Sequence, residues 1–176
     1  MSVRTDVLSA VEANLRDFGM QVSRSIELPD GSVADLFGSR THFSWKGLVI
    51  LSQHVVVRDF GDQVVTPADL KQLFDVGFRQ AKKVNRVPLL RGMQFGYMVV
   101  PCVIVASADR VLIESTESQP PKHWCLFEFP VVVDRSTGQT HYYGQTALWG
   151  AAFFSDMRGL VEQCIVPAVG AAEAAD

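Results

Sequence analysis

The sequence predicts an α+β domain with a mixed central β-sheet and helices on its faces. A nearly continuous apolar segment at residues 47–59 predicts a strand that is buried on both faces. Residues 66–85 combine helix-capping residues with an apolar stripe, which predicts a helix. Two later apolar segments, at 95–106 and 124–133, predict further strands. Strands and helices in this mixture are typical of one layered α+β domain.

Before the buried strand, the chain predicts one helix and two strands. Residues 5–18 place apolar side chains on one helical stripe, with Gly19 just beyond the end. Residues 20–28 and 32–43 read as strands, and the segment between them contains Pro29 and Gly31, which favour a turn. The expected order over the first hundred residues is therefore helix, three strands, helix, strand.

The helix at 66–85 has the clearest local signal in the chain. Thr66 and Asp69 have the spacing of a capping box, and Pro67 occupies the first helical position. Its outer face carries four cations, which are candidate nucleic-acid contacts, although a charged outer face is more often only solvated. The four cations are Lys71, Arg79, Lys82 and Lys83.

The second half of the chain predicts a C-terminal hairpin and a helix. Pro101 indicates a bulge, a strand start or an edge within 95–106. Residues 109–117 are ambiguous between a helix and a strand. A hairpin is expected from 124–133 and 140–143 around a loop, followed by a closing helix at 155–166. We expect one domain over residues 1–170 and a disordered tail at 171–176.

Composition limits the classes of protein that fit. The chain has 176 residues, 48% of them hydrophobic and 20% charged, with a formal net charge of −3. This balance is typical of a compact soluble protein and gives no bulk attraction to nucleic acid. The three cysteines lack CxxC spacing, so neither a disulfide framework nor a closed zinc site is indicated. With no signal peptide or membrane-length apolar run, we expect a cytoplasmic protein.

The order helix, three strands, helix, strand resembles that of the restriction-endonuclease-like superfamily over residues 5–106. The resemblance implies a metal-binding Asp on the second strand, matched by Asp35, and an acidic residue, a spacer and a Lys on the third. The third-strand residues fall at Ser52, Gln53 and His54, where Gln53 stands as a neutral oxygen ligand and no lysine follows. Glu12 on the first helix is a second candidate metal ligand, as in some relatives.

Residues 122–125 allow several readings. His123 and Cys125 have the spacing at which an imidazole activates a thiol, but no third orienting group is evident. Trp124 beside Lys122 is either a surface anchor or, more often, a core residue with a lysine at its rim. The apolar stretches 124–133 and 148–154 are candidate subunit interfaces for a self-associating protein. Nucleotide-loop, serine-hydrolase and metalloprotease motifs are absent from the sequence.

The sequence therefore favours a non-catalytic binding or assembly module with a degenerate nuclease-like core and no cofactor. The alternative is a divalent-metal-dependent nuclease acting on DNA or RNA, with Asp35, Gln53 and His54 as catalytic residues, Asp35 and Glu12 as metal ligands, and Mg²⁺ as cofactor. The expected partners are nucleic acid or a second copy of the chain, and not a membrane. All site predictions depend on Asp35 lying beside residues 52–54.

Overall fold

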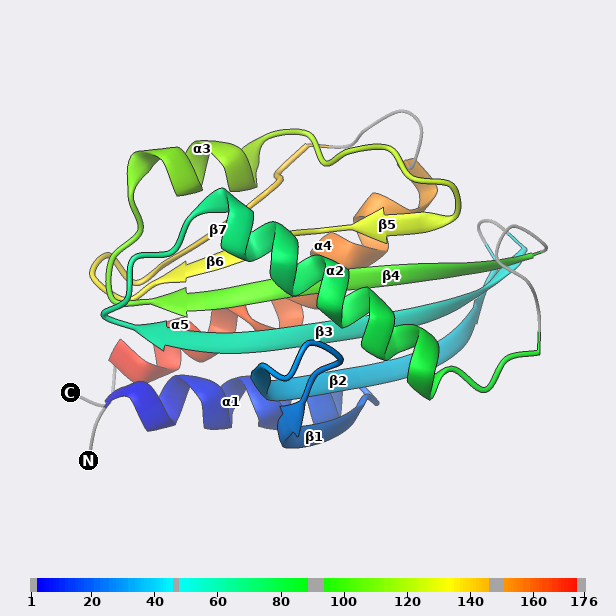
Figure 1. Ribbon diagram of the computed structural model, residues 1–176, viewed down its shortest axis with the longest axis horizontal. Helices are drawn as coiled ribbons and strands as arrows, with labels where there is room; N and C mark the ends of the chain where they lie inside the picture. The colour runs from blue at the N-terminus through cyan, green and yellow to red at the C-terminus, as the bar shows by residue number, and fades with distance from the viewer. Residues whose placement is uncertain (1–2, 46–47, 89–93, 146–150, 174–176) are drawn as a thin grey trace.

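The computed structural model describes residues 3–45, 48–88, 94–145 and 151–173. Its helices and strands are mixed along the chain, with two runs of three strands and two helices at the end (Figure 1). In order, they are α1 (Val3–Asp17), β1 (Gln21–Glu27), β2 (Val33–Ser44), β3 (Val49–Gly61), α2 (Pro67–Val84), β4 (Phe95–Val105), α3 (Arg110–Glu117), β5 (Leu126–Glu128), β6 (Val131–Asp134), β7 (Gln139–Tyr142), α4 (Ala151–Cys164) and α5 (Val166–Glu173).

The strands form one mixed, open sheet of seven strands. The main path is β1-β2-β3-β4-β6-β7, and β5 also pairs with β4. The pairs β1/β2, β2/β3 and β6/β7 are antiparallel, whereas β4 is parallel to β3, β5 and β6. The α+β class and the mixed central sheet are thus confirmed, and β3 and β4 are the buried central strands that the apolar segments predicted.

Helices cover both faces of the sheet. The larger core cluster lies between the sheet and α1, α4 and α5, while two smaller clusters lie on the face of α2 and α3. In Figure 1, α2 and α3 lie in front of the sheet, and α4 and α5 lie behind it. Period-2 geometry divides β3 between the faces: Leu51 and Val55 belong to the larger cluster and Val56 to the α2 side.

The start of α2 and its approach to the sheet follow from a few residues. Thr66 Oγ1 accepts from the Asp69 backbone N–H, and Asp69 Oδ2 accepts from the Thr66 N–H at 2.8 Å, which confirms the capping box. At Gly77, a Cβ atom would lie 2.8 Å from Cγ1 of Val56. The absent side chain therefore lets α2 pack closely on β3.

Pro101 lies inside β4 rather than at an edge, at a point where its missing N–H is tolerated. The Tyr97 N–H donates to the Cys125 carbonyl, and the Val99 carbonyl accepts from the Phe129 N–H. The backbone N–H and C=O groups of odd-numbered residues in β4 therefore point toward β5 and β6. β5 pairs with residues 97–99 of β4 and β6 with residues 102–105. The backbone nitrogen of Pro101 therefore faces the gap between β5 and β6, where a missing N–H costs no hydrogen bond between strands.

Several elements differ from the expected ones. The strand expected at 124–133 is split into β5 and β6, and β6 forms the hairpin with β7. Residues 110–117 form a helix, because Asp109 caps it by accepting from the Leu112 N–H at 2.7 Å. The closing helix α4 ends at Cys164, and Pro167 lies beyond it in the first turn of α5, where its missing N–H is not needed. α5 runs to Glu173, three residues into the expected tail, and residues 174–176 lie outside the described part.

None of the helices in the described part of the chain is long and apolar enough to cross a membrane.

Candidate functional site

The structure separates Asp35 from residues 52–54. In the β2/β3 register, His54 pairs with Ser39 and Gln53 with Arg40. Asp35 therefore lies at least four residues along β2 from these pairs, about 13 Å at 3.2–3.4 Å per residue. Its Oδ2 atom accepts from the backbone N–H of Asp59 at 2.7 Å. The expected juxtaposition of Asp35 with the 52–54 segment is therefore wrong, because the strand register places Asp35 near the end of β3.

Gln53 and His54 also point to opposite faces of the sheet. Gln53 is 2% exposed on the α1 side, where its Oε1 atom accepts from Nη2 of Arg40 at 2.9 Å and from Nε at 3.2 Å. Arg40 also donates to the carbonyl of Phe18 at 2.7 Å and lies over its ring. Gln53 therefore links β3 to the end of α1, and it is not placed to bind a metal ion with Asp35.

His54 lies on the α2 side, beside Ser52. A hydrogen bond of 2.8 Å joins Ser52 Oγ and His54 Nε2, and the imidazole stacks on Phe37 at a centroid distance of 5.6 Å. Burial lowers the pKa of His54 to about 4, so the ring is neutral near pH 7. His54 is therefore a buried histidine whose Nε2 atom is hydrogen-bonded to Ser52 and whose Nδ1 atom has no hydrogen-bond partner among the described residues.

Glu12 lies apart from both Asp35 and residues 52–54. Its carboxylate accepts from Nη2 of Arg16 at 2.7 Å and from Arg24 on β1. The hydrogen bonds from Arg16 and then Arg24 lower the pKa of Glu12. Glu12 therefore joins α1 to β1 through an ion-pair cluster, and it does not meet Asp35, Gln53 or His54.

The part of β3 beside Asp35 is Arg58–Asp59, which the sequence reasoning missed. Asp59 is only 2% exposed at its side chain and forms a two-pronged ion pair with Arg135, with distances of 3.0 and 2.6 Å. Asp35 thus meets the backbone of Asp59, while the Asp59 carboxylate itself is bound to Arg135. Among the described residues, no three His, Cys, Asp or Glu side chains are grouped so that they could hold a metal ion.

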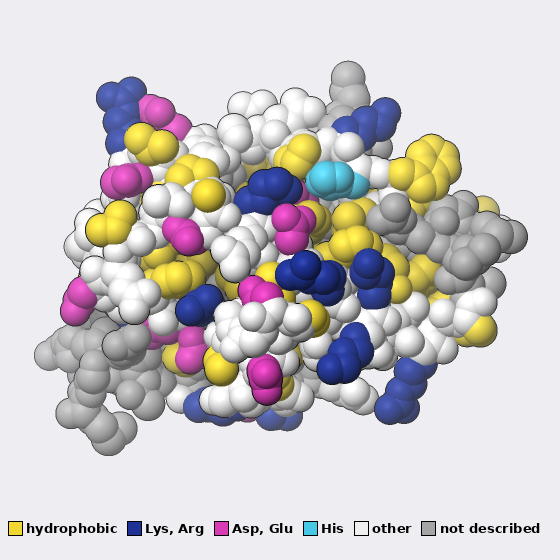
Figure 2. Space-filling view, in the orientation of Figure 1, with side chains coloured by type: hydrophobic (Ala, Val, Ile, Leu, Met, Phe, Trp, Pro, Cys, Tyr) yellow, Lys and Arg dark blue, Asp and Glu magenta, His cyan; other side chains and the backbone are white. Residues whose placement is uncertain are grey.

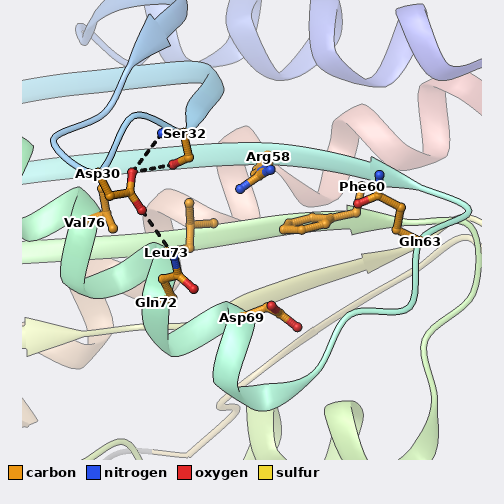
Figure 3. Close-up of a pocket in the computed structure, with 9 residues that line it drawn as sticks. All are labelled: Asp30, Ser32, Arg58, Phe60, Gln63, Asp69, Gln72, Leu73 and Val76. Atoms are coloured by element: carbon orange, nitrogen blue, oxygen red, sulfur yellow. Dashed lines mark hydrogen bonds between the residues drawn. The ribbon is translucent and has the colours of Figure 1, made fainter.

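Arg58 enters a small pocket of about 240 Å³ between the end of β3, the β1–β2 turn and the first half of α2 (Figure 3). Its guanidinium lies 4.7 Å from the centroid of the Phe60 ring. Asp30 in this pocket accepts from both the backbone N–H and the hydroxyl of Ser32, and from Gln72 at 3.2 Å. These hydrogen bonds connect the β1–β2 turn to α2, so the polar groups of this pocket stabilise the fold.

A larger groove, of about 630 Å³, lies between the C-terminal end of α2 and the β1–β3 part of the sheet. We call it the α2 groove. Among the described residues, its lining contains hydroxyl groups, the neutral His54 ring and the two arginines Arg40 and Arg86, and no carboxylate. Divalent cations in proteins are held mainly by carboxylate oxygens. The groove therefore suits a neutral or anionic ligand better than a metal ion.

The end of α2 next to this groove is strongly basic. Arg79, Lys82 and Lys83 are exposed on the helix and Arg86 is exposed just after it, and none of the four makes an ion pair with the described residues. We call these four residues the basic end of α2; Figure 2 shows dark-blue side chains gathered over this half of the helix. Lys71, in the first half, is instead 3.7 Å from Asp75. The predicted cations are thus exposed, but only three of them are unpaired.

The imidazole of His123 is paired with a carboxylate, and no hydrogen bond joins it to Cys125 among the described residues. His123 Nε2 lies 3.3 Å from Oε2 of Glu128, a carboxyl whose pKa is raised by burial although His123 opposes the shift. Trp124 is 73% exposed, so the prediction that it is a core residue is wrong, and a surface-anchor role stays a prediction. Leu126 to Val133 are buried in the chain's own core, which leaves little of the proposed 124–133 interface exposed. In the 148–154 stretch, residues 148–150 lie outside the described residues.

Fold and site together define an α+β protein with a mixed open sheet, a basic helix end and a carboxylate-free groove beside it. A scan against protein-family models and searches of curated proteins and of solved structures found no match.

Proposed function

We propose that this protein is a non-catalytic nucleic-acid-binding module and that it binds through the basic end of α2. The observation that carries the proposal is the set of four exposed cations within residues 79–86, unpaired among the described residues, beside a groove lined by arginines and without carboxylates. Phosphate groups attract such a surface at short range even when the whole chain is acidic. The αβββαβ order of the first 105 residues supports a degenerate nuclease-like core.

The nuclease alternative has less support. It requires carboxylates free to bind a divalent cation, but the Asp35 carboxylate accepts the backbone N–H of Asp59, and the Asp59 carboxylate is bound to Arg135. Gln53 and Glu12 point elsewhere. A catalytic reading therefore needs Arg135 to release Asp59, which costs the buried carboxylate its countercharge.

We expect the double variant Lys82→Ala/Lys83→Ala to weaken binding to a 20-nucleotide single strand about tenfold at low salt, and to lower the salt slope of log K by about 1.4, since each lost phosphate contact removes about 0.7. The measurement is fluorescence anisotropy over a salt series. The matched control is Arg16→Ala/Arg110→Ala, which removes one positive charge from α1 and one from α3.

Lys71→Ala should weaken binding less than the loss of an unpaired cation, because Asp75 already compensates the charge of Lys71.

Equal weakening by the control pair, or no retention of nucleic acid by the wild type, would refute the proposal. Cleavage of the strand with Mg²⁺ or Mn²⁺ that is abolished by Asp35→Ala would overturn its non-catalytic part. Light scattering on the same samples tests the assembly alternative: a dimer that persists on dilution would favour self-association.

A further inference from the structure

Trp124 is an exposed aromatic side chain on a firmly held turn. It is 73% exposed, and it lies between His123 and Leu126, which form an isolated antiparallel bridge. Cys125 has a φ of 47°, and its carbonyl accepts from the Tyr97 N–H of β4 at 3.1 Å. The turn is thus fixed to the central sheet, and the indole needs little ordering before a ligand binds.

The turn is also joined to α2 through stacked rings. The His123 ring stacks on Phe74 of α2 at a centroid distance of 5.8 Å, and Phe74 stacks on Phe78 at 6.5 Å. Two cations of the helix lie over these rings: Lys82 Nζ is 4.8 Å from the centroid of Phe78, and Lys71 Nζ is 6.0 Å from that of Phe74. This side of α2 therefore interleaves aromatic rings with positive charges.

We propose that this surface binds single-stranded nucleic acid, with one base stacked on Trp124 and the neighbouring phosphates held by Lys82 and by the exposed Lys122. The inference rests on the proposed nucleic-acid-binding function and names the form of the ligand. Lys122 on the same turn and Lys82 at the far end of the ring stack favour a polyanion, and an exposed indole face matches an unpaired base, whose own face is hidden in a duplex stack. An acidic protein segment would supply negative charge but no base to stack on Trp124, so it fits this surface less well.

The test compares two ligands of the same charge, oligo-dT of twelve nucleotides and an abasic deoxyribose-phosphate oligomer of the same length. We expect wild type to bind oligo-dT about 5- to 100-fold more tightly than the abasic oligomer, the range expected for stacking of one base. Trp124→Leu, which keeps an apolar side chain but removes the ring, should erase this ratio with the salt slope unchanged. Trp124→Phe should retain most of it.

Trp45 provides a control, since it is 81% exposed at the end of the β2–β3 hairpin. We expect Trp45→Leu to change the ratio less than twofold. Equal binding of both oligomers by wild type, equal loss from Trp45→Leu, or full competition by polyglutamate would overturn base stacking on Trp124. In each of these cases, a persisting effect of Lys82→Ala/Lys83→Ala would leave the nucleic-acid-binding proposal standing. If neither oligomer is retained, both proposals fail.

Discussion

Arg135→Met is expected to lower the free energy of unfolding by about 3–5 kcal/mol, because it removes the Arg135 side of a buried, two-pronged ion pair with Asp59. The side chain of Asp59 is only 2% exposed, and that of Arg135 is 15% exposed. For a chain of this length, such a loss lowers the Tm by roughly 10 °C or more. Chemical denaturation and calorimetry at pH 7 measure both quantities.

Two comparisons make this expectation specific. Arg110→Met removes the exposed pair with Glu114, in which the side chains are 89% and 61% exposed, and should change stability by no more than about 0.5 kcal/mol. Adding Asp59→Asn to Arg135→Met removes the buried charge and should restore a large part of the loss, since the amide oxygen can still accept the Gly61 N–H now bound at 2.9 Å. Equal effects of Arg135→Met and Arg110→Met would contradict a buried, strongly coupled pair.

The same variants test the degenerate nuclease site. Arg135→Met removes the cation bound to the Asp59 carboxylate, and Asp35 lies nearby because its carboxylate accepts the Asp59 N–H. If the core still has a latent metal site, Mn²⁺ should raise the Tm of Arg135→Met but not that of the double variant with Asp59→Asn. We expect no such difference, because both carboxylates also accept backbone N–H groups. A metal-dependent increase confined to Arg135→Met would favour the nuclease alternative.

The sequence predicted best what depends on neighbouring residues. Thr66, Pro67 and Asp69 set the start of α2 through contacts within one turn, so the capping box could be read directly. The buried strands were predicted from continuous runs of apolar residues. The split between β5 and β6 was missed because it depends on which residues of β4 they pair with.

The site was misplaced because it depends on strand register. The β2–β3 connection pairs Ser44 with Val49, and continuing this register brings Asp35 opposite Arg58. If the hairpin turn is placed one residue further along, the partner of every residue on β2 changes by two positions on β3. A small error in the position of the turn therefore pairs Asp35 with the wrong part of β3. Arg135, the partner of Asp59, is 76 residues away in the chain, and no local pattern indicates it.

His54 is expected to make the protein less stable as the pH falls from about 6.5 to about 4. Its pKa is lowered by burial to about 4 in the folded chain, against 6.5 as the ordinary value. Between these values the unfolded chain binds a proton that the folded chain does not, so unfolding becomes easier as the pH decreases. The shift corresponds to about 3 kcal/mol, fully expressed below pH 4 and absent above pH 6.5.

The variant His54→Phe isolates this effect, because it keeps a ring between Phe37 and Tyr97 but cannot bind a proton. Carboxyl groups also titrate in this range, so the quantity to compare is the difference between wild type and variant in free energy of unfolding at each pH. We expect wild type to lose about 3 kcal/mol relative to His54→Phe between pH 6.5 and 4. Parallel curves would mean that His54 takes up its proton as readily in the folded chain as in the unfolded chain, which would contradict the lowered pKa.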